Sequence, residues 1–190
     1  MKVLLTRRWP EAAEAAFATR FETQLSGDDR PLSPEALRAA LGEYDVLCPT
    51  VSDRLPAALW DGAAPQVKLI ANYGVGFEHI DLDACRARGV MVTNTPDVLT
   101  EATAELALTL LLMVARRAIE GWDEAREGRW TGWRPTHLMG LGLEGKVLGL
   151  VGYGKIAQAF ARKAALALGM KIACHARRPI GPSADGIEVV

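Results

Sequence analysis

The sequence predicts an α/β fold built from parallel βαβ units. Short apolar segments alternate with helical segments along the chain, and a turn with two glycines, Gly152 and Gly154, joins an apolar segment to a helix. The 190 residues are 49% hydrophobic and 24% charged, the balance of an ordinary globular protein. Strands that alternate with helices pair in parallel, so we expect two α/β domains, residues 1–97 and residues 98–190.

The first of these domains alternates strands and helices throughout. Its apolar segments predict strands at residues 1–6, 21–25, 45–50, 67–74 and 90–95. Its helical segments predict helices at residues 11–20, 33–41, 55–63 and 79–89. We expect Ser33 to cap the second helix with Pro34 at its first position, and Gly89 to end the last one.

The second domain opens with a long apolar helix, expected over residues 100–119. Thr100 is expected to cap this helix, and Arg116 and Arg117 to lie in its negative last turn. Its apolar surface is too wide for one amphipathic stripe, which indicates burial on several sides, partly against another subunit. A connection rich in Gly and Trp, residues 121–145, is expected to be ordered but without regular structure.

After this connection the pattern is that of a single βαβ unit. The expected elements are a strand at Lys146–Gly152, a helix at Lys155–Leu168 closed by Gly169, and a strand at Lys171–His175. Residues 187–190 read as the beginning of another strand. Because a dinucleotide-binding domain needs several more parallel strands, we expect this chain to be part of a longer protein.

Composition argues against several classes of partner and compartment. The net charge of -1 is unlike that of a nucleic-acid-binding or anionic-membrane-binding surface. The longest apolar run, residues 106–115, is too short to span a bilayer, and the N-terminus does not resemble a signal peptide. The three cysteines are far apart and odd in number, so we expect a reducing, cytoplasmic location and no nucleic-acid or membrane partner.

The turn after residue 151 predicts a phosphate-binding loop. Gly152-Tyr153-Gly154-Lys155-Ile156 has the first two glycines of the dinucleotide fingerprint, and Ala157 stands at the third, which the fingerprint permits. Glycines let the backbone approach a pyrophosphate, whose charge then lies at the helix N-terminus beside Lys155. The alternative is a tight strand-to-helix turn that binds no ligand.

The next strand lacks the acidic residue that holds the ribose of NAD. No Asp or Glu occurs between Glu144 and Asp185, and the strand ends in Ala176-Arg177-Arg178. Guanidinium groups bind the extra phosphate of NADP, which a carboxylate would repel, and Ala176 leaves room beside them. These residues predict NADP(H) as cofactor. Alternatively, the two arginines merely solvate a surface loop.

Three segments together resemble the D-2-hydroxyacid dehydrogenase family, most closely its NADPH-dependent glyoxylate/hydroxypyruvate reductases. The segments are ANYGVGFEHIDLDACRARGVMVTNTPDVLTEATAELALTLLLMVARR from residue 71, GRWTGW from residue 128 and LEGKVLGLVGYGKIAQAFARKAALALGMKIACHARRP from residue 143. The resemblance implies a flavodoxin-like substrate domain followed by the opening βαβ of a Rossmann domain. It also implies a homodimer formed through the helix at residues 100–119 and the Trp-containing connection.

The resemblance also assigns binding residues. The N–H groups of Val75 and Gly76 would bind the substrate carboxylate, as glycine-flanked amides can, although Gly74 and Gly76 could simply serve a strand-end turn. Thr103 would contact the nicotinamide or its phosphate. Asp97 stands where many members of the family have Gly, so the hinge there is expected to differ slightly.

No catalytic residue is expected within this chain. The Arg, Glu and His of family catalysis would lie beyond residue 190. His79 and His137 show no carboxylate partner in the sequence and His175 is expected to face the adenosine end, so all three are interpreted as non-catalytic. The cysteines are interpreted as packing residues.

The sequence therefore predicts an oxidoreductase that acts on CH-OH donors and uses NADPH to reduce a small 2-oxo acid, glyoxylate or hydroxypyruvate, in the intact protein. Residues 1–190 alone are expected to be inactive. Two alternatives stay open: a nucleotide-sensing, corepressor-like binding protein of the same fold, and another NAD(P)-dependent D-2-hydroxyacid dehydrogenase.

Overall fold

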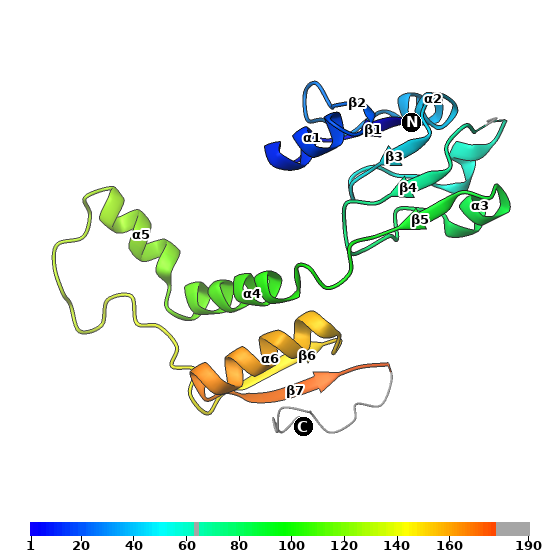
Figure 1. Cartoon of the computed structure of the whole chain (residues 1–190). Coiled ribbons are helices and arrows are strands. Elements are labelled where there is room, and N and C mark those ends of the chain that lie inside the picture. The colour runs from blue at the N-terminus through cyan, green and yellow to red at the C-terminus, as the bar shows by residue number, and fades with distance from the viewer. Residues whose placement is uncertain (63–64, 178–190) are drawn as a thin grey trace. The chain divides into compact units, whose positions relative to one another are not determined.

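The computed structural model describes residues 1–62 and 65–177, which form two compact units, Met1–Val98 and Leu99–Val190 (Figure 1). The strand expected at residues 187–190 lies outside the described residues, as does Arg178.

The first unit contains a five-stranded, fully parallel sheet. Its strand order is β2-β1-β3-β4-β5, which is the flavodoxin-like order and confirms that prediction. The strands are β1 (Lys2–Leu5), β2 (Glu22–Gln24), β3 (Val46–Cys48), β4 (Leu69–Ala71) and β5 (Met91–Thr93). The order reverses between β1 and β3, and ligands of such folds bind outside the carboxyl ends of the strands at this kind of position.

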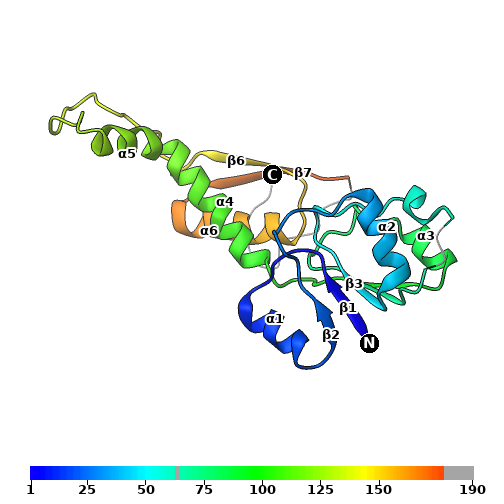
Figure 2. The ribbon, with the colours of Figure 1, turned by 90° about the horizontal axis from the view of Figure 1, so that it is seen from above.

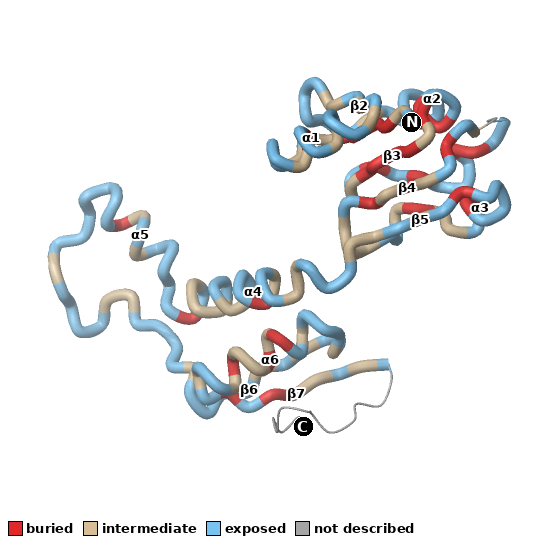
Figure 3. The backbone as a smooth tube through the Cα atoms, in the orientation of Figure 1, coloured by how far each residue is buried: buried red, intermediate tan, exposed pale blue. Residues whose placement is uncertain are grey.

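Helices cover both faces of this sheet (Figure 2). They are α1 (Glu11–Ala18), α2 (Pro34–Glu43), the 3-10 helix η1 (Ala57–Trp60) and α3 (Leu82–Ala87). Alternate strand residues face opposite layers, as the pleat requires: Leu47 packs with α2, η1 and α3, whereas Val46 packs on the side of α1. Figure 3 shows the buried residues of this unit along its central strands.

Two helix starts show how short side chains set the boundaries. The Ser33 hydroxyl accepts a hydrogen bond from the Ala36 N–H at 3.2 Å, so the predicted cap of α2 is confirmed. In α3 the Asp81 carboxylate accepts from the Ala84 N–H at 2.8 Å, and the helix therefore begins at Leu82 rather than at residue 79.

The described part of the second unit contains three helices and a two-stranded parallel sheet. Its elements are α4 (Thr100–Ala115), α5 (Ala118–Arg126), β6 (Val147–Val151), α6 (Lys155–Leu168) and β7 (Lys171–His175). β6 and β7 pair from Val147 with Lys171 to Val151 with His175. Glu101 of α4 forms ion pairs with Arg162 and Lys163 of α6, and apolar residues of both helices share one core.

The long helix differs from its prediction at both ends. Thr100 is its first residue and not its cap; Leu99 holds the cap position without a side-chain hydrogen bond. The helix ends at Ala115, because Arg117 adopts a left-handed conformation with φ of 52°, and a second helix, α5, follows. The connection expected from residue 121 therefore begins with helical residues. Of the helices described, none is long and apolar enough to cross a bilayer.

Candidate functional site

The glycine turn after β6 lies directly against the end of β7. The Gly152 N–H donates a hydrogen bond to the His175 carbonyl at 2.7 Å, and Gly152 has φ of 93°, a conformation that favours glycine. Gly154 holds the cap position of α6. This bond extends the pairing of β6 with β7 by one residue, so the chain leaves the sheet at Gly152.

The N-terminus of α6 is suited to an anion. No side chain caps it, no acidic residue lies in its first turn, and its first residues are Lys155 and Ile156. The first helical amides have no intrahelical acceptor, and the helix dipole places partial positive charge there. The side-chain amide of Gln158, in the same helix, donates to the Tyr153 carbonyl at 3.0 Å and so ties the turn to α6.

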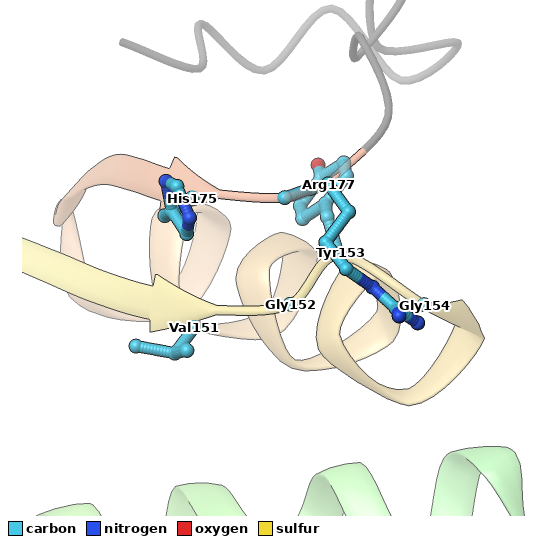
Figure 4. Close-up of a pocket in the computed structure, with 7 residues that line it drawn as sticks. Val151, Gly152, Tyr153, Gly154, His175 and Arg177 are labelled. Carbon is cyan, nitrogen blue, oxygen red and sulfur yellow. The ribbon is translucent and has the colours of Figure 1, made fainter.

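A pocket of about 870 Å³ brings the two halves of the predicted cofactor site together (Figure 4). Its described lining is Val151, Gly152, Tyr153, Gly154, His175, Ala176 and Arg177. Figure 4 shows the Arg177 side chain extending from the end of β7 toward the turn that carries Tyr153 and Gly154. The glycine turn and Arg177 thus line one cavity although they are more than twenty residues apart in the sequence.

The remaining predicted cofactor residues are not among the described residues that line this pocket. Lys155 and Ile156 follow Gly154 in the first turn of α6, and Ile156 is 37% exposed. Thr103 is half-buried in the first turn of α4.

The residues of the pocket fit a dinucleotide phosphate. A Cβ built on Gly152 or Gly154 meets no described atom within 4 Å, so packing does not demand glycine at either position. At Gly154 φ is -79°, which any residue adopts, and the open space beside this backbone leaves room for the close approach of a phosphate.

The turn after β4 holds the predicted substrate-binding amides. Its carbonyl groups accept side-chain hydrogen bonds: Gly74 and Gly76 from the Asn72 amide at 3.2 Å and 2.8 Å, and Val75 from the Asn94 amide at 2.9 Å. Within the described part of the chain, neither the Val75 nor the Gly76 N–H donates a hydrogen bond. Two backbone donors are therefore available to an anion, as expected for a carboxylate site.

An aromatic side chain from the loop after β1, Trp9, also supports this turn. The Trp9 ring stacks on Tyr73 with centroids 4.5 Å apart, and its edge meets Phe17 at 5.3 Å. The backbone N–H of Trp9 donates to the buried Glu14 carboxylate at 2.8 Å, and the Arg8 guanidinium holds the pKa of that carboxyl below its usual value. Sequence reasoning missed Asn72, Asn94 and Trp9.

The expectation that His137 lacks a carboxylate partner is wrong. His137 does have a carboxylate partner, because its Nε2 lies 2.6 Å from the buried Glu124, which also accepts from Arg134 at 2.8 Å. This cluster ties the Trp-containing connection to α5. His79 contacts Asn72 at 3.0 Å, and burial lowers its pKa. In residues 1–62 and 65–177, no three His, Cys, Asp or Glu side chains gather as a metal site requires.

Comparison with known proteins places this arrangement in a family. The sequence model of a protein family, the D-isomer specific 2-hydroxyacid dehydrogenase catalytic domain, matches residues 3–178. The chain belongs to the D-isomer specific 2-hydroxyacid dehydrogenase family. This confirms the family that the sequence resembles.

Individual members of the D-isomer specific 2-hydroxyacid dehydrogenase family align over nearly the whole chain. A glyoxylate reductase of Thermococcus onnurineus is 41% identical over 180 residues, which cover 93% of this chain and 53% of the relative. The human glyoxylate reductase/hydroxypyruvate reductase is 39% identical over 166 residues, 86% of this chain and 50% of the relative.

A solved structure agrees in fold as well as in sequence. The crystal structure of the TT0316 protein from Thermus thermophilus superposes with a TM-score of 0.86 at 45% identity, covering all of this chain and 60% of that one. The chain thus spans about half the length of the curated relatives it matches.

Proposed function

We propose that the intact protein is an NADPH-dependent reductase of a small 2-oxo acid, glyoxylate or hydroxypyruvate, and that residues 1–97 form its substrate domain while residues 98–190 belong to its nucleotide-binding domain. The observation that carries the proposal is the pocket that Gly152, Gly154 and Arg177 line together. The names of the Thermococcus and human relatives agree with this activity.

The cofactor would be held by two groups of residues. The amides of the Gly152–Ile156 turn and the charge of Lys155 suit the pyrophosphate. Arg177, beside the small Ala176, suits the additional phosphate of NADPH, and Arg178, outside the described residues, is proposed to assist. Thr103 is proposed to contact the nicotinamide end. When bound, the nicotinamide supplies the hydride for the reduction.

The turn after β4 would bind and orient the substrate. The N–H groups of Val75 and Gly76 donate to its carboxylate, which fixes the adjacent carbonyl carbon in one orientation. We assign no proton transfer to His79, because its Nε2 is bound to Asn72 and burial lowers its pKa.

A dimer through α4, α5 and the Trp-containing connection is part of the proposal. These segments expose large apolar side chains, among them Val114 at 79%, Trp122 at 68% and Trp133 at 83%. Exposed apolar surface of this size marks an interface. Light scattering on the intact protein tests it: a dimer that Val114→Glu converts to monomer supports the proposal, whereas a monomeric wild type opposes it. The free cysteines suit a reducing cytoplasm.

Steady-state assays of the intact protein test the activity. With NADPH we expect turnover of glyoxylate and hydroxypyruvate and none of acetaldehyde, because an aldehyde without a carboxylate cannot engage the Val75 and Gly76 amides. Equal turnover of acetaldehyde, or no turnover of any 2-oxo acid, would refute the proposed activity.

A further inference from the structure

The turn at residues 74–76, called the substrate turn below, is held by hydrogen bonds to its carbonyl groups. These bonds determine where its N–H groups point. A trans peptide is planar, and its carbonyl oxygen and N–H point in opposite directions; the described chain contains no cis peptide. The Gly74 carbonyl shares a plane with the Val75 N–H, and the Val75 carbonyl shares the next plane with the Gly76 N–H. A donor that fixes either carbonyl therefore fixes one of the two substrate-binding amides.

Asn94 fixes the second of these planes. It follows β5 in sequence, is half-buried, and donates from Nδ2 to the Val75 carbonyl at 2.9 Å. The direction of the Gly76 N–H consequently depends on a side chain from the neighbouring strand.

Asn72 fixes the planes on either side. It is 2% exposed, and its backbone N–H donates to the Thr93 carbonyl at 2.9 Å, which anchors it to β5. Its Nδ2 donates to the Gly74 carbonyl at 3.2 Å and the Gly76 carbonyl at 2.8 Å. The Thr95 N–H adds a second donor to Gly74 at 3.0 Å.

His79 fixes the orientation of the Asn72 amide. Both partners on one side of that amide are carbonyl oxygens, so the nitrogen must lie there and Oδ1 on the other side. Oδ1 lies 3.0 Å from Nε2 of His79, and this nitrogen must carry the hydrogen. A flipped Asn72 would place an oxygen against two carbonyls and lose the His79 bond.

We propose that Asn72 and Asn94 are positioning residues that aim the Val75 and Gly76 N–H groups at the substrate carboxylate, with His79 locking Asn72. The inference rests on the proposed function for its substrate class and adds the residues on which carboxylate recognition depends. They act through the peptide planes of the turn and are not catalytic residues.

Asn94→Ala in the intact protein is the decisive variant, because it removes the donor without adding charge. Loss of one directed amide–carboxylate bond predicts that KM for glyoxylate rises about 10-fold or more, while kcat changes little and NADPH affinity is unchanged. Asn94→Asp, which turns the donor into an acceptor beside the Val75 carbonyl, is expected to raise KM further. Asn72→Ala should raise KM likewise.

Gln24→Glu is the matched control. The Gln24 amide also donates to a backbone carbonyl, that of Leu25 at 2.9 Å, but on the edge strand β2, three strands from β4. This variant should leave KM at the wild-type value. If Asn94→Ala loses NADPH affinity at the same time as its KM rises, the effect is a general loosening of the fold, and the inference is overturned.

Binding of oxalate, a stable dicarboxylate probe, separates this inference from the proposed function. If the wild type reduces glyoxylate but Asn94→Ala keeps its KM, the inference is wrong and the function stands. If the wild type reduces no 2-oxo acid yet binds oxalate more tightly than Asn94→Ala does, the function fails and the positioning role stands. Oxalate affinity that is equal in both proteins, or oxalate that binds neither, overturns the positioning role.

Discussion

The backbone nitrogen of Gly152 lies 2.7 Å from the His175 carbonyl oxygen, and this hydrogen bond joins the first glycine of the proposed phosphate loop to the last residue of β7. Arg177 follows two residues after His175. The backbone at the end of β7 is therefore held beside the glycine turn by one strand pairing, and a change at Gly152 should affect both parts of the proposed cofactor site.

Gly152→Ala is expected to weaken NADPH binding and to destabilise the protein. A φ of 93° is strained for a residue with a Cβ, and such strain costs about 1–3 kcal/mol. Isothermal titration and thermal unfolding measure the two effects. Gly149→Ala is the control, because its Cβ also meets no described atom within 4 Å but it lies in β6 without a positive φ. Equal effects of both variants would contradict the role of the Gly152 conformation.

The stack of Trp9 on Tyr73 is expected to show energetic coupling. Aromatic pairs at centroid separations such as 4.5 Å contribute about 0.5–1.5 kcal/mol beyond burial. A double-mutant cycle of Trp9→Leu and Tyr73→Leu, measured by denaturant unfolding, should give a coupling free energy in that range. Strict additivity would show that the ring contact contributes nothing of its own to the turn.

Stability should depend on His79 below neutral pH. Burial lowers the pKa of His79 from its ordinary 6.5, while Asp53 and Glu78 oppose this shift only in part. As pH falls below about 6.5, the unfolded chain takes up a proton that the folded chain does not, so the free energy of unfolding decreases. When the pH is lowered from 7.5 to 5, the Tm of His79→Gln should fall less than the Tm of the wild type. The same variant at the exposed His175 should follow the wild type, and an unchanged pH profile in His79→Gln would refute the assignment.

Two of the cysteines are expected to be unreactive in the folded protein. Burial raises the pKa of Cys48 to about 12 and that of Cys85 to about 11, and both thiols are buried in the first unit. Since the thiolate is the nucleophile, peptide mapping after alkylation at pH 7.5 should find both residues unlabelled until denaturant is added. Labelling of either one at the rate of a free thiol would contradict the described core.

Local signals in the sequence were enough to place several elements. The helix at Lys155–Leu168 and the strand at Lys171–His175 match their predicted bounds, because Gly154 and Gly169 mark both helix ends. The end of the long helix at Ala115 was missed, since apolar periodicity continues past it and nothing in the residue type of Arg117 announces a left-handed conformation.

The side chains that support the turn at Val75 and Gly76 could not be predicted from the sequence. Asn94 lies 19 residues from Val75, and Trp9 lies far from Tyr73 in the chain; each meets its partner only because β1, β4 and β5 run in parallel with their carboxyl ends at one edge. An Asn just after a strand is a weak signal by itself, because Asn is common in turns. The partner of His137 was hidden for a similar reason: Glu124 becomes buried only once α5 forms.

The ratio of dissociation constants for NADH and NADPH, measured on the intact protein and its Arg177→Ala variant, tests the central claim most directly. The account predicts that the wild type binds NADPH at least about 10-fold more tightly and that the variant loses most of this preference, since one charge-assisted bond to phosphate is worth about 1.5–3 kcal/mol. Arg126→Ala, at an exposed arginine of the same unit, should keep the wild-type ratio. Equal affinity for both dinucleotides, or a preference for NADPH that survives Arg177→Ala, would contradict it.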